Sequence, residues 1–380
     1  MTALGSAIPD GGAADPIHVM VVDDSAVIRG LLTRTLEADP AIRVVASVGN
    51  GQMALNALQR SDVDVAILDI EMPVMDGMSA LPKLIAAQPG LQVIMASTLT
   101  HKNAAISLQA LEQGAADYVT KPGSTGGLIS ATDFQRELIG KVKTLGLAAR
   151  KAQARSGPRP ARRGSVLPAL RKPEGPKPVR LRDAPIAPPQ VIAIGSSTGG
   201  PQALFSVLGR MADAIKVPVL VTQHMPATFT TILAEHLAQA SGMPAAEGRD
   251  GEPVIGGRIY VAPGDFHMTV VAEGQNRLIR LTKEPPENFC RPAVDPMLRS
   301  VAAVYGRGAL AVILTGMGQD GMRGAQVLTA AGGSVIAQDE ATSVVWGMPG
   351  AVATAGLCNA VLPLRDVSSF IRKLVLRSAA

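Results

Sequence analysis

Residues 17–25 read IHVMVVDDS, an apolar run that ends in two adjacent aspartates. Residues 63–69 read VDVAILD and residues 91–97 read LQVIMAS, two more apolar runs that end in a polar side chain. Continuous apolar runs are typical of parallel strands that helices cover on both faces. Residues 25–38 instead carry apolar side chains at helical spacing. This alternation continues along the chain and predicts a doubly wound α/β domain with five parallel strands over residues 17–147.

The alternation begins again in the second half of the chain. Residues 191–195 (VIAIG), 217–223 (VPVLVTQ) and 309–315 (ALAVILT) predict further parallel strands with helices between them. Residues 269–281 (TVVAEGQNRLIRL) differ, because two strand-like runs flank a turn that contains glycine. We therefore expect a second doubly wound, mostly parallel domain over residues 190–377, with one β-hairpin.

The composition is that of a folded, water-soluble chain. Its 380 residues suffice for two domains, and hydrophobic residues make up 47% and charged residues 18%, which argues against a wholly disordered or fibrous protein. No apolar run approaches the roughly 20 residues that span a bilayer, and the N-terminus lacks the pattern of a signal peptide. The two cysteines, Cys290 and Cys358, have no metal-binding spacing. We expect a cytoplasmic protein without membrane insertion.

The positive charge of the chain is concentrated in one segment. Residues 150–189 hold eleven Lys and Arg against Glu174 and Asp183, so the rest of the chain is mildly acidic although the net charge is +5. The same segment contains nine prolines and few large apolar residues, and it lacks the aromatic side chains that accompany nucleic-acid binding. We interpret residues 148–189 as a flexible linker, residues 1–16 as a disordered tail, and expect no nucleic-acid partner.

Three carboxylates are expected to converge at one edge of the first sheet. Asp23 and Asp24 end the first strand and Asp69 ends the third, and the carboxyl ends of parallel strands lie together where ligands bind. Three converging carboxylates repel one another unless a hard cation such as Mg²⁺ lies between them. One of them could then attack phosphorus as a nucleophile. Two supporting groups follow the fourth and fifth strands: a hydroxyl from Ser97 or Thr98, and the ammonium of Lys121.

These segments resemble a response-regulator receiver domain. The resemblance covers residues 17–147 and rests on VVDDS, LDIEMPVMDG, IMAST and YVTKP. It implies a flavodoxin-like fold and phosphorylation of Asp69, with Mg²⁺ as the cofactor. It further implies these roles: Asp23, Asp24 and Asp69 hold Mg²⁺, Ser97 is the switch hydroxyl, Tyr118 is the switch aromatic, and Lys121 supports the phosphoryl group.

A second motif lies at the start of the second domain. Residues 195–199 read GSSTG and fit G-x-S-x-G, directly after a predicted strand and before a helix that begins at Pro201. Such a turn presents its central serine, here Ser197, at the sheet edge of hydrolase-type α/β domains, with helix amides near a developing oxyanion. A glycine-rich turn that binds phosphate or packs tightly is the alternative.

A nucleophilic serine needs a base and an orienting carboxylate. His224 ends the strand VPVLVTQ, at the same sheet edge as the serine motif, whereas His267 lies in a loop and is the second candidate. Asp320 follows the strand ALAVILT and a glycine-rich turn, and it is the favoured acid. Asp295 and Asp339 are weaker candidates.

The second domain resembles the catalytic domain of chemotaxis protein-glutamate methylesterases over residues 190–377. Matching segments include VIAIGSSTGGPQAL, VTQHMPATFT, RPAVDPMLRSVA and VILTGMGQDG. The order serine, histidine, aspartate differs from the order in lipase-like hydrolases, which disfavours that class. The resemblance implies these roles: Ser197 is the nucleophile, His224 the base and acid, Asp320 the orienting carboxylate, and Met317 and Thr198 support the oxyanion. Ser196 is a second, adjacent hydroxyl.

The resemblance also implies the reaction and its setting. The expected activities are hydrolysis of glutamate methyl esters on bacterial chemoreceptors, which releases methanol, and deamidation of receptor glutamines. The esterase reaction is expected to need no cofactor, and a chemotaxis histidine kinase is expected to donate the phosphoryl group. One hypothesis is that the unphosphorylated receiver covers the esterase cleft. Two other function classes are a phosphorylation-controlled interaction protein without turnover and a receiver-linked general esterase.

Overall fold

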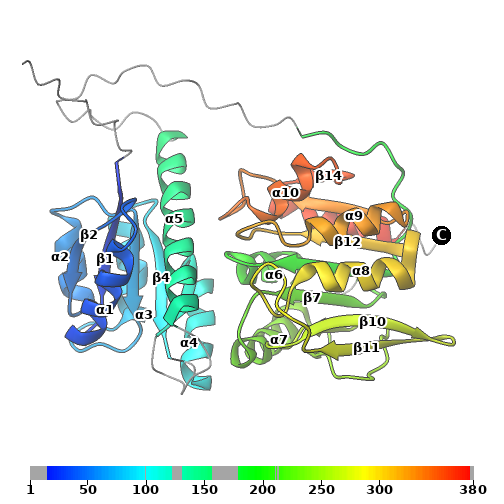
Figure 1. The fold of residues 1–380 in the computed structure, drawn as a ribbon, viewed down its shortest axis with the longest axis horizontal. Coiled ribbons are helices and arrows are strands. Elements are labelled where there is room, and N and C mark those ends of the chain that lie inside the picture. The colour runs from blue at the N-terminus through cyan, green and yellow to red at the C-terminus, as the bar shows by residue number, and fades with distance from the viewer. Residues whose placement is uncertain are drawn as a thin grey trace, which may run out of the picture. The chain divides into compact units, whose positions relative to one another are not determined.

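The computed structural model describes residues 15–98, 100–121, 131–155, 179–209, 211 and 214–376. These residues form two parallel sheets, each with its own helices, and one two-stranded hairpin (Figure 1). The predicted tail lies outside the described residues except for Asp15 and Pro16, and so do residues 156–178 of the predicted linker. Among the described residues, no helix is both long and apolar enough to cross a membrane.

The first sheet has five parallel strands in the order β2-β1-β3-β4-β5. This is the predicted flavodoxin-like arrangement, in which the strand order reverses between β1 and β3. All residues of β3 are buried, as expected for a strand that helices cover on both faces. The elements are β1 (Ile17–Val22), α1 (Ala26–Glu37), β2 (Ile42–Val48), α2 (Gly51–Leu58), β3 (Val65–Asp69), α3 (Gly77–Ala87), β4 (Gln92–Ser97), α4 (His101–Glu112), β5 (Asp117–Thr120) and α5 (Ala131–Arg155).

Side-chain caps fix where the helices of this domain begin. Ser25 accepts a hydrogen bond from the amide of Ile28 at the start of α1, and Asp76 accepts one from Ser79 at 2.7 Å at the start of α3. At Gly77, an added Cβ would lie 2.0 Å from the carbonyl oxygen of Asp69. Only glycine therefore lets α3 begin directly against the end of β3.

Two observations refine the predicted linker. Helix α5 continues to Arg155, so residues 148–155 are helical although we assigned them to the linker. The later residues of the same segment contact the second domain. The amide of Arg182 donates to the carbonyl of Cys358 at 2.8 Å, and Asn359 donates to the carbonyl of Ala184 at 3.0 Å. The predicted linker thus has a helical start and an attached end.

The second sheet has seven parallel strands in the order β14-β13-β12-β6-β7-β9-β8. The chain builds outward from β6 through β7 on one side and from β12 through β14 on the other. The strand order therefore reverses between β6 and β12, where open α/β sheets bind ligands. The strands are β6 (Val191–Ser196), β7 (Val219–Gln223), β8 (Ala245–Glu247), β9 (Ile259–Val261), β12 (Ala309–Ile313), β13 (Ser334–Gln338) and β14 (Ala360–Leu362).

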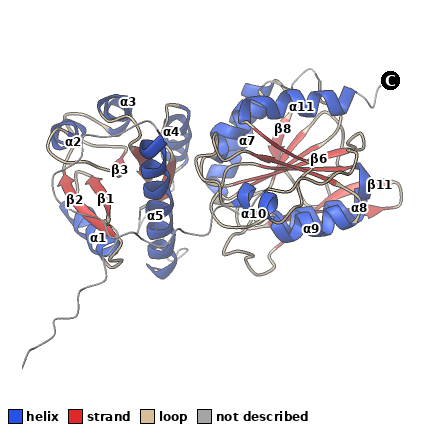
Figure 2. Ribbon diagram, turned by 90° about the horizontal axis from the view of Figure 1, so that it is seen from above, coloured by secondary structure: helices blue, strands red, loops and turns tan. Residues whose placement is uncertain are grey.

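Helices cover both faces of this sheet (Figure 2). Helices α6, α7 and α11 lie on one face, and α8, α9 and α10 lie on the other. The predicted hairpin is confirmed: β10 (His267–Glu273) pairs antiparallel with β11 (Asn276–Thr282) and packs against α8. The helices are α6 (Gly200–Leu208), α7 (Ala227–Ser241), α8 (Val294–Tyr305), α9 (Met322–Ala330), α10 (Met348–Thr354) and α11 (Leu364–Leu376), with a short 3-10 turn η1 (Gly306–Gly308).

Candidate functional site

The turn between β6 and α6 carries Ser197 at the reversal point of the second sheet. Its left-handed residue is Gly199, with φ 75°, and an added Cβ there would lie 2.7 Å from Val344. At Gly200, an added Cβ would lie 2.0 Å from Oε1 of Gln223. Close packing therefore requires glycine at both of these positions. The turn that they allow brings Ser197 to the end of the sheet.

The two adjacent serines have different environments. Ser196 is fully buried, and its hydroxyl donates to Oε1 of Gln223 at 2.7 Å. Ser197 is partly exposed, and its backbone amide donates to the carbonyl of Thr315 at 3.0 Å. Gln223 also donates from Nε2 to the carbonyl of Ser197 at 2.9 Å. The Ser196 hydroxyl is thus committed to Gln223, which leaves the Ser197 hydroxyl as the one at the surface of the site.

His224 follows β7 and is held from both ring nitrogens. Its Nε2 lies 2.7 Å from Oδ2 of Asp320, and its Nδ1 lies 3.3 Å from Sγ of Cys290. Burial of the imidazole disfavours its charged form, but Cys290 and Asp320 outweigh burial and raise the pKa of His224 well above its ordinary value. The histidine and the aspartate predicted from sequence are therefore neighbours in space.

Asp320 lies at the N-terminus of α8 and is supplied with hydrogen-bond donors. It accepts from the amides of Val294 at 2.6 Å and Asp295 at 3.1 Å, the first two residues of the helix. Nδ2 of Asn288 donates to the same carboxylate at 2.9 Å. Burial favours the neutral acid, but the hydrogen bond from His224 and these amides lower the pKa of Asp320. The residue is suited to remain a carboxylate beside the imidazole.

The serine and the histidine directly follow two adjacent strands. Ser196 of β6 is in register with Gln223 of β7, and the amide of His224 donates to the carbonyl of Ser196 at 3.2 Å. Ser197 and His224 thus leave the sheet side by side. Among the hydrogen bonds of the described residues, none joins the Ser197 hydroxyl to the His224 ring. Met317 follows β12 in the same region, where an added Cβ on neighbouring Gly316 would lie 2.9 Å from Cβ of Ser197.

The alternative candidates have other partners. His267 is buried, and both of its ring nitrogens face backbone groups: Nδ1 accepts from the amide of Ala293 and Nε2 lies 3.2 Å from the carbonyl of Pro285. Asp339 accepts hydrogen bonds from Thr342. Neither arrangement brings these residues to Ser197. Asp295, in contrast, lies next to Asp320.

Three residues of the site were missed at the level of sequence. Gln223 joins the two serines, Asn288 donates to both Asp295 and Asp320, and Cys290 contacts His224. The position of Gln223, directly before His224 at a strand end, was the one available signal. Nothing in the spacing of Asn288 or Cys290 connects them with residues so far away in the chain.

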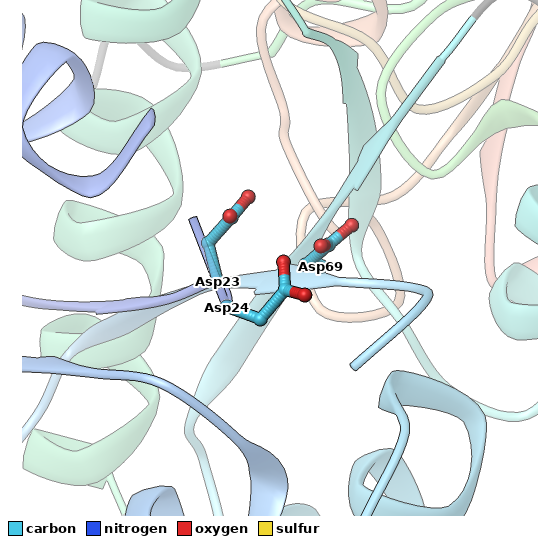
Figure 3. A group of neighbouring side chains, drawn as sticks. All are labelled: Asp23, Asp24 and Asp69. Atoms are coloured by element: carbon cyan, nitrogen blue, oxygen red, sulfur yellow. The ribbon is translucent and has the colours of Figure 1, made fainter. Parts of the chain in front are cut away.

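The three carboxylates of the first domain also come together (Figure 3). Each of Asp23, Asp24 and Asp69 has a ligand atom within 4.8 Å of the others, at the reversal point between β1 and β3. Asp23 and Asp69 are buried and Asp24 is exposed. Arg29 of α1 donates to the carbonyls of Asp23 and Asp24 and so places positive charge beside the cluster. The arrangement can hold one hard cation through oxygen ligands.

The supporting residues of this domain lie at the ends of β4 and β5. Ser97 ends β4, and its hydroxyl donates to the carbonyls of Thr98 at 3.0 Å and Asn103 at 3.3 Å. The amide of Lys121 donates to the carbonyl of Ser97 at 2.7 Å, which joins the ends of the two strands. Tyr118 lies within β5. All three are thus at or near the edge of the sheet that carries the aspartates.

Comparison with known proteins agrees with the division of the chain into two domains. The CheB methylesterase family matches residues 192–371, and the response regulator receiver domain family matches residues 19–133. The protein-glutamate methylesterase/protein-glutamine glutaminase 1 of Paramagnetospirillum magneticum is 60% identical over 377 residues, which cover 96% of this chain and 98% of the relative. The corresponding protein of Azospirillum brasilense is 60% identical over 384 residues, with 98% and 96% covered. The crystal structure of the Thermotoga maritima CheB methylesterase catalytic domain is 41% identical, covers 49% of this chain and 99% of that chain, and has a TM-score of 0.48.

Proposed function

The chain belongs to the family of protein-glutamate methylesterase/protein-glutamine glutaminases that carry a response-regulator receiver domain, and from that premise we propose that Ser197, His224 and Asp320 perform its acyl-transfer chemistry. The observation that carries this proposal is the 2.7 Å contact between His224 and Asp320 at the strand end next to Ser197. The proposed substrates are glutamate methyl esters and glutamine amides on chemoreceptors, in the adaptation step of bacterial chemotaxis.

The proposed reaction follows from the hydrogen bonds of the imidazole. Because ionised Asp320 accepts from Nε2, that nitrogen carries the proton and the lone pair of His224 lies on Nδ1. Nδ1 takes the proton of Ser197 as its oxygen attacks the side-chain carbonyl of the substrate. The same nitrogen then protonates departing methanol or ammonia, and water releases the new glutamate by the reverse sequence.

The oxyanion of the tetrahedral intermediate needs donors other than the amide of Ser197. That amide already donates to the carbonyl of Thr315. We assign the role to the backbone amide of Met317, in the loop beside Ser197, with Thr198 as a second supporting residue. Preorganised amide donors of this kind are usually the largest single contribution to acyl transfer.

The first domain is proposed to be phosphorylated on Asp69. The donor set of Asp23, Asp24 and Asp69 fits Mg²⁺, because three carboxylates within 4.8 Å offer oxygen ligands and need a compensating cation. When bound, Mg²⁺ neutralises charge on the incoming phosphoryl group. Asp69 supplies the attacking oxygen, and we propose a chemotaxis histidine kinase as the donor. Ser97, Tyr118 and Lys121 are the proposed residues that respond to the phosphoryl group.

The test of this function is methanol release from methylated receptor fragments by the full chain. Ser197→Ala should lower the rate by a factor of at least about 1,000, because it removes the nucleophile. Ser196→Ala is the matched control: it deletes the neighbouring hydroxyl and one buried hydrogen bond, which costs about 1–2 kcal/mol of stability, but leaves the nucleophile in place. Equal losses in the two variants, or no methanol release by the unmodified chain, would overturn the proposal.

A further inference from the structure

Cys290 occupies the side of the His224 ring on which the proposed reaction takes place. Its sulfur lies 3.3 Å from Nδ1, while Asp320 holds Nε2 on the opposite side of the ring. Since Nε2 carries the proton, Nδ1 is an acceptor and the Cys290 thiol is its donor in the neutral pair. The nitrogen that must receive the Ser197 proton is therefore already hydrogen-bonded to another side chain.

The turn that presents Cys290 is fixed from several sides. Residues 287–290 form a two-residue hairpin turn, closed by hydrogen bonds between the backbones of Glu287 and Cys290 at 3.1 and 2.9 Å. Both central residues are left-handed, with φ 51° at Asn288 and 63° at Phe289. Non-glycine residues rarely adopt the left-handed conformation, and they keep it only where neighbouring contacts hold the backbone in place.

Two side-chain contacts provide that support. Arg299 of α8 forms a bidentate ion pair with Glu287, in which Nη1 donates to Oε2 at 2.9 Å and Nη2 donates to Oε1. Asn288 donates to Asp320 at 2.9 Å and to Asp295 at 3.1 Å. The turn is thus tied to the same carboxylate that orients His224. The position of the thiol relative to the imidazole is set by the fold and not by a mobile loop end.

We propose that Cys290 is a positioning residue of the acyl-transfer site: its thiol holds Nδ1 of His224 in the resting enzyme and must yield that nitrogen to Ser197 for reaction. This inference rests on the proposed roles of Ser197 and His224. It has a direct chemical consequence. A group attached covalently to the sulfur would occupy the Nδ1 side of the ring, where the proposed proton transfer from Ser197 takes place, and would stop hydrolysis without modifying either residue.

The charged surroundings of the imidazole give the proposal a pH signature. The titratable and charged groups that face this region are Asp320 after β12, Cys290 before α8, Asp295 on α8 behind Asp320, His267 at the start of β10, and the pair of Glu287 and Arg299. Of these, Cys290 and Asp320 are the ones that raise the pKa of His224. Cys290 raises it only when its sulfur carries negative charge opposite the protonated ring, because a neutral thiol that donates to Nδ1 stabilises the neutral ring instead. Removing Cys290 removes this partner of the imidazolium, which lowers the pKa of His224 and lets the proposed base become neutral at lower pH.

The first experiment uses iodoacetamide on the full chain, with labelling of each cysteine followed by mass spectrometry. The sulfur displaces iodide, a C–S bond forms as the C–I bond breaks, and the thiol proton passes to Nδ1. Cys358, the only other cysteine of the sequence, is an internal control, because it is buried and burial raises its pKa to about 12. We expect selective labelling of Cys290, and slower labelling in His224→Gln. Labelling of Cys358 in a variant would indicate that the variant has unfolded, because this cysteine is buried in the folded chain.

This labelling rate does not depend on esterase activity, so it separates the two proposals. If the unmodified chain releases no methanol but His224→Gln slows Cys290 labelling severalfold, the proposed function fails and the thiol–imidazole pair stands. If His224→Gln leaves the labelling rate unchanged in a folded chain, the inference is overturned whatever the esterase does.

The second experiment measures methanol release against pH for the unmodified chain, Cys290→Ala, Cys290→Ser and Cys358→Ala. Both Cys290 variants should shift the acidic limb of kcat/KM to lower pH, and Cys290→Ser, which keeps a hydroxyl donor, should retain more activity than Cys290→Ala. Labelling should inactivate the unmodified chain and Cys358→Ala but not Cys290→Ser. An unshifted limb in both Cys290 variants, or full activity of the labelled chain, would contradict the role.

Discussion

At the scale of single residues, the two carboxylates behind His224 differ in environment. Asp320 is surrounded by donors and its pKa is lowered, as described above. Burial raises the pKa of Asp295, and neighbouring Asp320 adds to that effect, although the amide of Gly324 donates to it at 2.7 Å. In adjacent carboxyl groups with opposite pKa shifts, the group with the lowered pKa ionises first and the other keeps its proton to higher pH. Asp320 is therefore the more readily ionised of the two and the better suited to the proposed role of orienting carboxylate.

The matched pair Asp320→Asn and Asp295→Asn tests this division. Asp320→Asn removes the charge beside His224 and presents a donor to the protonated Nε2, so we expect methanol release to fall about a thousandfold or more. Asp295→Asn changes a residue behind Asp320 whose partners are Asn288 and the amide of Gly324, and the loss should be much smaller. Equal losses in kcat/KM would show that the two carboxylates act as one unit.

The pKa of His224 leads to a prediction about pH. The proposed base must be neutral, and its folded-state pKa is raised, so the acidic limb of kcat/KM should lie above the ordinary histidine value of about 6.5. Whereas kcat/KM should rise with pH, the free energy of unfolding should fall. The stabilisation from the charged imidazolium is complete at low pH and is lost as the pH rises through the folded-state pKa of His224. A methanol-release profile with its limb at or below the ordinary value would contradict the assignment, and Asp320→Asn should move the limb to lower pH.

At the scale of elements, helices α8 and α9 cap each other. Asp320, in the loop before α9, accepts from the first amides of α8, whereas Asp295 of α8 accepts from the amide of Gly324 in the first turn of α9. Neither helix has a side-chain cap from its own N-cap residue. Two N-terminal amides of α8 and one of α9 are thereby satisfied, and the positive end of α8 faces the carboxylate beside His224.

The β6–α6 turn gives a prediction at the same scale. In Gly200→Ala, the new methyl group would collide with Gln223 and disrupt its bonds to both serines. The collision should cost about 1–3 kcal/mol, more than the roughly 1 kcal/mol that alanine gains over glycine within a helix. Calorimetry of the full chain should show a lower unfolding temperature for the second domain and lower activity. The control is Gly30→Ala in α1, where an added Cβ meets nothing within 4 Å and stability should rise slightly.

At the scale of the whole molecule, the chain contains two domains that place their candidate sites in the same way. Both sheets are parallel and doubly wound, and in both the strand order reverses beside the candidate site. The first site gathers three carboxylates, for which we propose phosphoryl chemistry, and the second gathers a serine, a histidine and an aspartate, for which we propose acyl transfer. The family to which the chain belongs unites the two as a phosphorylation-regulated esterase.

The coupling between the two activities can be measured directly. Acetyl phosphate with Mg²⁺ should raise methanol release by the unmodified chain, and Asp69→Asn should abolish the increase because the attacking oxygen is missing while the esterase residues remain. Removing Mg²⁺ with a chelator should have the same effect as the variant, since the three carboxylates then lack their cation. An increase that persists in Asp69→Asn would place the phosphorylated residue elsewhere.

The sequence alone determined the fold class and the general location of both sites. Alternating apolar runs and amphipathic segments define parallel strands and helices, and the carboxyl ends of parallel strands always lie at one edge. Asp23, Asp24 and Asp69 could therefore be grouped from their strand ends alone. The same argument placed Ser197, His224 and Asp320 at a common edge of the second sheet.

Only the tertiary structure decided which neighbours these residues have. It shows that Ser196 is committed to Gln223, that Asp320 lies against His224 with Asp295 behind it, and that Cys290 contacts the second ring nitrogen. Such contacts join residues from different elements, and they depend on rotamers, turn geometry and burial. Local patterns do not encode those distances, because the packing of distant segments determines them.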